Sequence, residues 1–152
     1  MGRVYNVFSG VIFTTAAGDW VLRVLAVAEK PFKIKRIWMT SSDVAGASAP
    51  EVEVHRVTDA GPAGTACQKT PMLQADAATT VDADYDLGQA SDPTSSAELW
   101  RGHWNCQVPF DLVFGPGDEP VIPGAANEGF AVKLETVVAP NMHVGATIEE
   151  MA

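Results

Sequence analysis

The sequence predicts an all-β fold, an antiparallel β-sandwich formed by one domain over residues 1–152. Apolar residues alternate with polar ones in eight separate runs, which is the period of a strand with one buried face. Glycine (13 residues) and proline (10 residues) are frequent, which indicates many turns. A chain of 152 residues corresponds to about one domain and is long enough to bury a sizeable core.

The eight runs are rich in Val, Ile, Phe, Trp and Thr, which favour strands. Turn-forming segments such as AAGD, AGPAG and GPGDEP separate them, and no segment predicts a helix of three turns. The expected strands cover residues 5–13, 19–28, 32–41, 51–57, 98–106, 110–114, 129–137 and 142–150. The expected core contains Trp20, Leu22, Val24, Trp100, Trp104, Phe130, Val132, Leu134 and Ile148.

The acidic, alanine-rich segment 71–93 interrupts this rhythm. A connection of this length favours a crossover between two sheets with a short strand in it, such as ATTVDA, and Greek-key sandwiches and jelly rolls require such crossovers. Within it, Asp82, Asp84 and Asp86 resemble the first half of a calcium loop. The required glycine and the closing glutamate are missing, so we expect a solvated acidic turn.

The stretch WRGHWNC combines a cysteine and a histidine, as a nucleophile and its base would. In a strand, however, alternate side chains point to opposite faces. One face then carries Trp100, Gly102, Trp104 and Cys106, and the other carries Arg101, His103 and Asn105. The first face is expected in the core, with Gly102 leaving room for the indoles, so no Cys–His pair forms within this segment.

Other signs of chemistry are weak. His55, His103 and His143 lie singly on three expected strands, without the spacing of a metal site, and no nucleophile elbow or phosphate-binding loop occurs. We therefore expect no catalytic residue, no metal, no cofactor and no enzyme activity. Cys67 and Cys106 are expected to be free thiols, with a disulfide between them as the alternative.

The net charge of −9 and the pI near 4.6 argue against nucleic acid as a partner, because phosphate recognition needs a clustered cationic surface. No apolar run has the length of a membrane span, and the first ten residues carry no export signal. We therefore expect no membrane association.

Several motifs occur in an order that resembles a known family. They are EVEVHRVT, the DEPVIPG turn that leads into GFAVKL, and the final EE. Their succession along nearly the whole chain resembles the small jelly-roll capsid decoration, or cement, proteins of tailed bacteriophages. The chain departs from them in its compact GPGDEP segment, in its cysteines and in WRGHWN.

The resemblance implies a virion structural protein, made in the host cytoplasm, that binds the outer surface of the icosahedral head and stabilises it. Its implied partners are the major capsid protein and further copies of the chain, in a homotrimer at or near local threefold axes. A contact arm is expected at 1–9, because its apolar residues occupy both faces of a terminal strand. Candidate contact residues are Arg3, Tyr5, Val7, Phe8 and Trp38.

Two alternatives remain open. A receptor- or carbohydrate-binding module of a phage fibre or tail would line a groove with aromatic residues, and Trp38, Trp20 and Tyr85 are the first to test. A cupin-type enzyme would require His55, His103 and His143 to gather around a metal ion.

Overall fold

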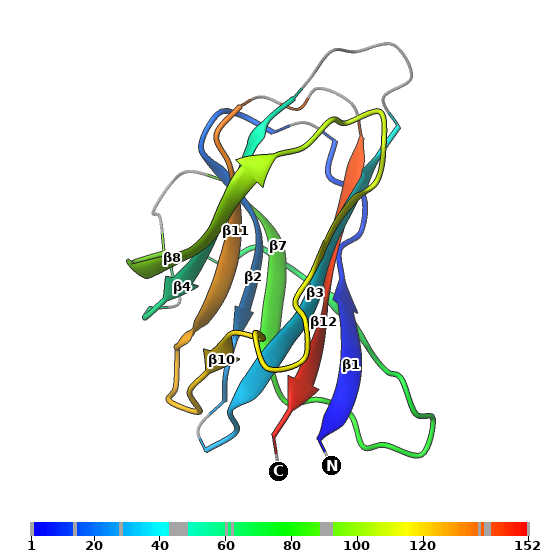
Figure 1. The fold of residues 1–152 in the computed structure, drawn as a ribbon, viewed down its shortest axis with the longest axis vertical. Helices are drawn as coiled ribbons and strands as arrows, with labels where there is room; N and C mark the ends of the chain where they lie inside the picture. Colours follow the sequence, from blue (N-terminus) through cyan, green and yellow to red (C-terminus); the bar gives the residue numbers. More distant parts are fainter. Residues whose placement is uncertain are drawn as a thin grey trace.

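The structure is a computed structural model that describes residues 2–13, 15–27, 29–42, 49–59, 61, 63–88, 93–136, 138 and 141–151. These residues form strands and loops only, and no helix among them is long and apolar enough to cross a membrane. Figure 1 shows two sheets packed face to face, with both chain ends at the same end of the molecule. The strands are β1 (Arg3–Phe8), β2 (Asp19–Leu25), β3 (Phe32–Ser41), β4 (Glu51–Val57), β5 (Thr65–Ala66), β6 (Gln68–Pro71), β7 (Asp82–Gly88), β8 (Ser95–His103), β9 (Phe110–Val113), β10 (Val121–Ile122), β11 (Gly129–Leu134) and β12 (Met142–Glu150).

The strands pair into two antiparallel sheets. Sheet A has the order β10–β3–β12–β1–β6. The short strands β10 and β9 both pair with the same edge of β3, β10 at residues 32–33 and β9 at residues 36–39. Sheet B has the order β5–β7–β2–β11–β4–β8. The predicted antiparallel sandwich is therefore confirmed.

The connections follow jelly-roll topology. The chain crosses between the sheets from β1 to β2, from β2 to β3 and from β3 to β4, and it crosses again in its second half. The late strand β12 lies between β1 and β3, and β11 lies between β2 and β4. The sets β1–β12–β3–β9 and β2–β11–β4–β8 are thus two interleaved Greek keys. The segment after β6 leads from sheet A to β7 in sheet B, as the predicted crossover requires.

Alternation explains where the core lies. The apolar residues of β3 and β12 that point inward are fully buried, and they meet the inward residues of β2, β4 and β11 in one cluster. Phe32 of sheet A packs edge-to-face on Phe130 of sheet B, with ring centroids 6.1 Å apart. Each sheet therefore covers the apolar face of the other.

The predicted core is largely confirmed. Trp104 is 1% exposed and donates a hydrogen bond from Nε1 to the Val108 carbonyl at 2.7 Å. Trp100 is only partly buried; its ring packs 5.5 Å from that of Phe110, and a Cβ at residue 102 would overlap it. Trp20 is buried outside the main core, in a second cluster with Leu25, Val57, Leu87 and Ala131.

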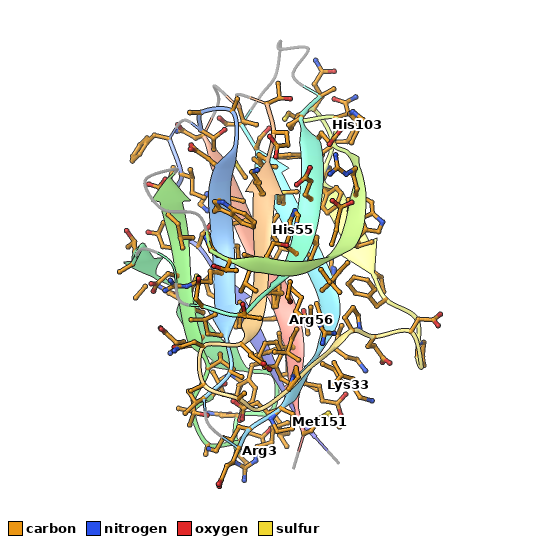
Figure 2. All side chains as sticks on the ribbon, turned by 90° about the vertical axis from the view of Figure 1, so that its left-hand side faces the viewer. Arg3, Lys33, His55, Arg56, His103 and Met151 are labelled. Carbon is orange, nitrogen blue, oxygen red and sulfur yellow. The ribbon has the colours of Figure 1, made fainter. Side chains whose placement is uncertain are left out.

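This second cluster shields part of the outer face of sheet B around β2. All seven residues of β2 are buried, so both faces of that strand are shielded. Residues 59 and 94, from the segments that follow β4 and precede β8, are hydrogen-bonded to each other, and Figure 2 shows β8 bending across the front of this sheet. The prediction of an alternately buried and solvated strand was wrong here, because the second cluster and the ion pair of Arg23 with Asp84 bury the outward residues of β2.

The predicted acidic turn around residues 82–86 was wrong in its backbone and for Asp84, whereas Asp82 and Asp86 are exposed as predicted. These residues belong to β7, which lies between β5 and β2. Asp84 is 8% exposed, and it accepts a hydrogen bond from Arg23 Nη2 at 2.6 Å and another from the Gly64 backbone at 3.2 Å. The buried guanidinium stabilises a carboxylate that the local sequence suggested was solvated.

The expected contact arm at 1–9 is part of the sandwich over its described residues. Residues 3–8 form β1, which pairs with β12 on one side and with β6 on the other. Tyr5 and Val7 are fully buried, and the Tyr5 hydroxyl donates to the Ala77 carbonyl at 2.9 Å. Burial, and then the charge of Glu150, raise the pKa of Tyr5. These two side chains therefore have no surface to offer a partner in this fold.

Cys67 and Cys106 are both buried, and no disulfide joins them, as predicted.

Candidate functional site

The outer face of sheet A carries an aromatic row across three strands. Phe8 of β1 pairs with Gly145 of β12, which pairs with Trp38 of β3, and Trp38 pairs with Asp111 of β9. Because Gly145 has no side chain, the indole of Trp38 lies over it, where a Cβ would overlap the ring. Phe8 and Trp38, two of the predicted contact residues, therefore lie in the same row on either side of Gly145.

A hollow of about 360 Å³ opens beside this row. We call it the Trp38 hollow; it is lined by Asn6, Arg36, Trp38, Thr40, Pro109, Phe110 and Asp111. Its walls combine a flat aromatic ring with amide, hydroxyl, guanidinium and carboxylate groups. This combination suits a ligand with one apolar face and several hydrogen-bonding groups.

An ion pair shapes one wall of the hollow. Arg36 donates from Nε to Asp111 Oδ1 at 2.6 Å and from Nη2 to Oδ2 at 3.0 Å. The hydrogen bond to Asp111 raises the pKa of Arg36, so the pair stays charged. Asn6 lines another part of the hollow. Its side-chain oxygen accepts a hydrogen bond from the Thr147 hydroxyl at 2.8 Å, which holds the Asn6 amide in place.

The outer face of sheet B carries a charged cluster along β4 and β8. We call it the Arg101 cluster; it consists of Glu51, Glu53, His55, Glu98 and Arg101. Arg101 forms ion pairs with all three carboxylates, at 2.7 Å from Glu53 and 2.7 Å from Glu98, and also with Glu51. The hydrogen bond from Arg101 lowers the pKa of Glu98 and, in return, raises that of Arg101.

The three histidines do not gather as a cupin-type site would require. His55 lies near the middle of sheet B and His103 near the end of β8, as Figure 2 shows. His143 belongs to β12 of sheet A, where its neighbours Met142 and Val144 point into the core. The three-histidine metal site is therefore not formed.

The remaining predicted residues are separated. Arg3 is exposed at the end of the molecule where the chain ends lie, 3.9 Å from Asp76 (Figure 2). Tyr85 belongs to β7, Trp20 is buried, and neither lines the hollow with Trp38. In the stretch WRGHWNC, Trp104 and Cys106 are buried, whereas Arg101, His103 and Asn105 are exposed. The predicted separation of Cys and His is therefore confirmed. The strand β8 is shorter than expected and ends at His103.

Sequence reasoning missed the Arg101 cluster. Alternation alone places Glu51, Glu53 and His55 on one face of β4, which is a usable signal. Glu98 and Arg101 join them through the pairing of β4 with β8, where His55 faces Glu98 and Glu53 faces Arg101. That pairing contains two register shifts, so the local pattern could not predict it.

Comparison with protein-family models, with curated proteins and with solved structures finds no match to this chain. The function is therefore argued from its surfaces.

Proposed function

We propose that this chain is a structural protein of a tailed-bacteriophage virion, a decoration protein that binds the outer surface of the icosahedral head through the outer face of sheet A. The observation that carries this proposal is the difference between the two outer faces. The outer face of sheet B carries the ion-paired Arg101 cluster beside the fully buried strand β2, whereas sheet A presents Phe8, Trp38 and the exposed Val113 outward. Aromatic residues with a polar surround are characteristic of protein–protein contacts.

The charge and the fold support the same function. A net charge of −9 keeps unassembled copies apart and speeds their association with a basic rim on a shell. One domain of 16.1 kDa offers a modest contact area, and three linked copies in a homotrimer would add their contacts through effective concentration. The partners of this proposal are the major capsid protein and two further copies of the chain.

Cosedimentation with capsid particles that lack the protein tests the proposal. Trp38→Ala should weaken binding at least about tenfold, the loss expected for a central aromatic contact. Thr65→Ala, a change at an exposed residue of sheet B, is the matched control and should bind like the parent. Unchanged binding of Trp38→Ala would reject this docking face, and failure of the parent to bind particles would reject the decoration function.

The Trp38 hollow favours a second candidate function, a receptor- or carbohydrate-binding module. A sugar ring could stack on the indole while Asn6, Thr40 and the Arg36–Asp111 pair bind its hydroxyl groups. Binding to a glycan array that Trp38→Ala abolishes, without binding to particles, would favour this candidate over decoration.

A further inference from the structure

The Arg101 cluster brings three metal-binding side chains together on the outer face of sheet B. Glu53 and His55 are two residues apart on β4 and point to the same side, and Glu98 lies opposite His55 on β8. One ligand atom from each of these three residues lies within 4.8 Å of the other two. Two neighbouring strands thus offer one imidazole nitrogen and two carboxylate oxygens to a common point.

His55 is already oriented as a ligand. Its Nδ1 lies 2.8 Å from Ser95 Oγ, which fixes the ring, and its Nε2 points to Glu53 Oε2 at 2.6 Å. Metal-binding histidines are held in this way, with one ring nitrogen bonded to a neighbouring polar group and the other directed at the ion. Trp20 and the His55 ring pack in an edge-to-face arrangement, with ring centroids 5.3 Å apart.

The charges of the cluster do not balance. Glu51, Glu53 and Glu98 carry three negative charges, and Arg101 supplies one positive charge. The Glu53 side chain is 6% exposed, so its charge is shielded from water and needs a partner nearby. With His55 neutral, as a metal ligand must be, a dication would neutralise the two remaining charges of the cluster.

The indole that packs on the His55 ring also carries a donor that is unpaired within the described part of the chain. Trp20, 3% exposed, has a buried Nε1 without a hydrogen-bond acceptor among the described residues. Such donors are rare in folded proteins and call for an acceptor that protein atoms do not provide.

We propose that Glu53, His55 and Glu98 form a zinc site that ties β4 to the edge strand β8. Zinc accepts imidazole nitrogen and carboxylate oxygen at about 2.0–2.2 Å, and three protein ligands with one water complete its four positions. Two tetrahedral ligands at those bond lengths lie about 3.3 Å apart. His55 Nε2 and Glu53 Oε2 are 2.6 Å apart, so the distance between them must increase by less than about 1 Å when the ion binds. The Arg101 side chain is 49% exposed, so it turns toward solvent and Glu51 when the ion enters.

Titration of the metal-free protein tests the site. Calorimetry with ZnCl₂ should give one ion per chain, and CoCl₂ should give the visible bands of a four-coordinate site. His55→Gln and Glu98→Gln should each weaken zinc binding at least about 100-fold, because each removes a ligand. His143→Gln is the matched control: it removes a histidine from sheet A and should leave the zinc affinity unchanged.

The variant Arg101→Gln distinguishes two explanations of the cluster, a metal site and a network of ion pairs that needs no metal. Removal of a cation from beside the ion should strengthen zinc binding about tenfold. Circular dichroism checks that each variant is folded. If His55→Gln unfolds, Glu98→Gln still tests the loss of a ligand, because its side chain is exposed and its replacement should leave the fold intact. The proposal would be overturned if the parent protein bound no zinc at millimolar zinc, or if Glu98→Gln bound zinc as tightly as the parent. It would also be overturned if His143→Gln lost as much zinc affinity as His55→Gln.

Discussion

Gly145 supports the Trp38 indole from beneath, and its replacement by alanine tests how the outer face of sheet A is built. A Cβ at this position would overlap the ring at Cζ2 and Cε2 and would lie 2.8 Å from Cη2. Since non-bonded carbon atoms prefer separations of about 3.5–4.0 Å, the ring must move outward by roughly 1 Å or more. Gly145 does not have a positive φ, so alanine itself fits the backbone.

The free-energy change follows from two opposing contributions. A fully buried aromatic side chain hides about 150–250 Å², and displacing the partly buried Trp38 would expose about 100 Å². At about 25 cal/mol per Å², this costs up to about 2.5 kcal/mol. Replacing a strand glycine by alanine returns about 0.5–1 kcal/mol. Gly145→Ala should therefore destabilise the parent protein by up to about 1.5–2 kcal/mol.

The sign should reverse when the indole is absent. In a Trp38→Ala background, only the gain from removing glycine remains, so Gly145→Ala should stabilise by about 0.5–1 kcal/mol. Urea unfolding of the parent, both single variants and the double variant, followed by far-ultraviolet circular dichroism, measures both values. Gly115→Ala, where the nearest atom would be 3.7 Å from the new Cβ, is the control. Equal destabilisation by Gly145→Ala in both backgrounds would refute the placement of Trp38 over Gly145.

Three further outcomes are expected. Trp104→Phe should lower the free energy of unfolding by about 2–3 kcal/mol in urea unfolding, because it leaves a gap and removes the hydrogen bond to Val108. The Lys35 hydrogen bond, with one from the Gly117 backbone, lowers the pKa of Glu119 from 4.5 to about 2, so its stabilisation is present above pH 4.5 and is lost as the pH falls toward 2. Glu119→Gln should flatten that part of the stability profile, measured by thermal unfolding at several pH values; an unchanged profile would contradict the assignment. Burial raises the pKa of Cys67 to about 12, so mass spectrometry after iodoacetamide treatment at pH 8 should find this thiol unmodified in the native protein and alkylated only after unfolding.

The strands that could be predicted from the sequence are those with one buried face and clear turn residues at both ends. The bounds expected at 32–41, 51–57 and 142–150 are those of β3, β4 and β12. In these strands, alternation arises because one face meets the opposite sheet and the other meets water. The local pattern therefore carries the same information as the three-dimensional surroundings.

The position of β7 could not be predicted in this way. A short strand such as ATTVDA was expected within 71–93, but β7 lies at Asp82–Gly88, where its stability depends on a distant partner. Its acidic residues suggest solvent exposure when they are considered alone. The buried Asp84 is paired with Arg23, which is 61 positions away in a strand that is otherwise almost wholly apolar. A single arginine in an apolar strand is a signal that a carboxylate lies opposite, but the sequence does not indicate which of the acidic residues it is.

The same limit explains why the stretch WRGHWNC was understood only in part. The buried Trp104 and Cys106 and the exposed Arg101 and His103 follow the predicted alternation, although β8 ends at His103 and the two buried residues lie in the segment after it. The partners of Arg101 depend instead on the register between β4 and β8, which shifts twice. A local pattern therefore predicts that Arg101 points away from the core. Only the pairing of β4 with β8 places it among three carboxylates and brings the ligands of the proposed metal site together.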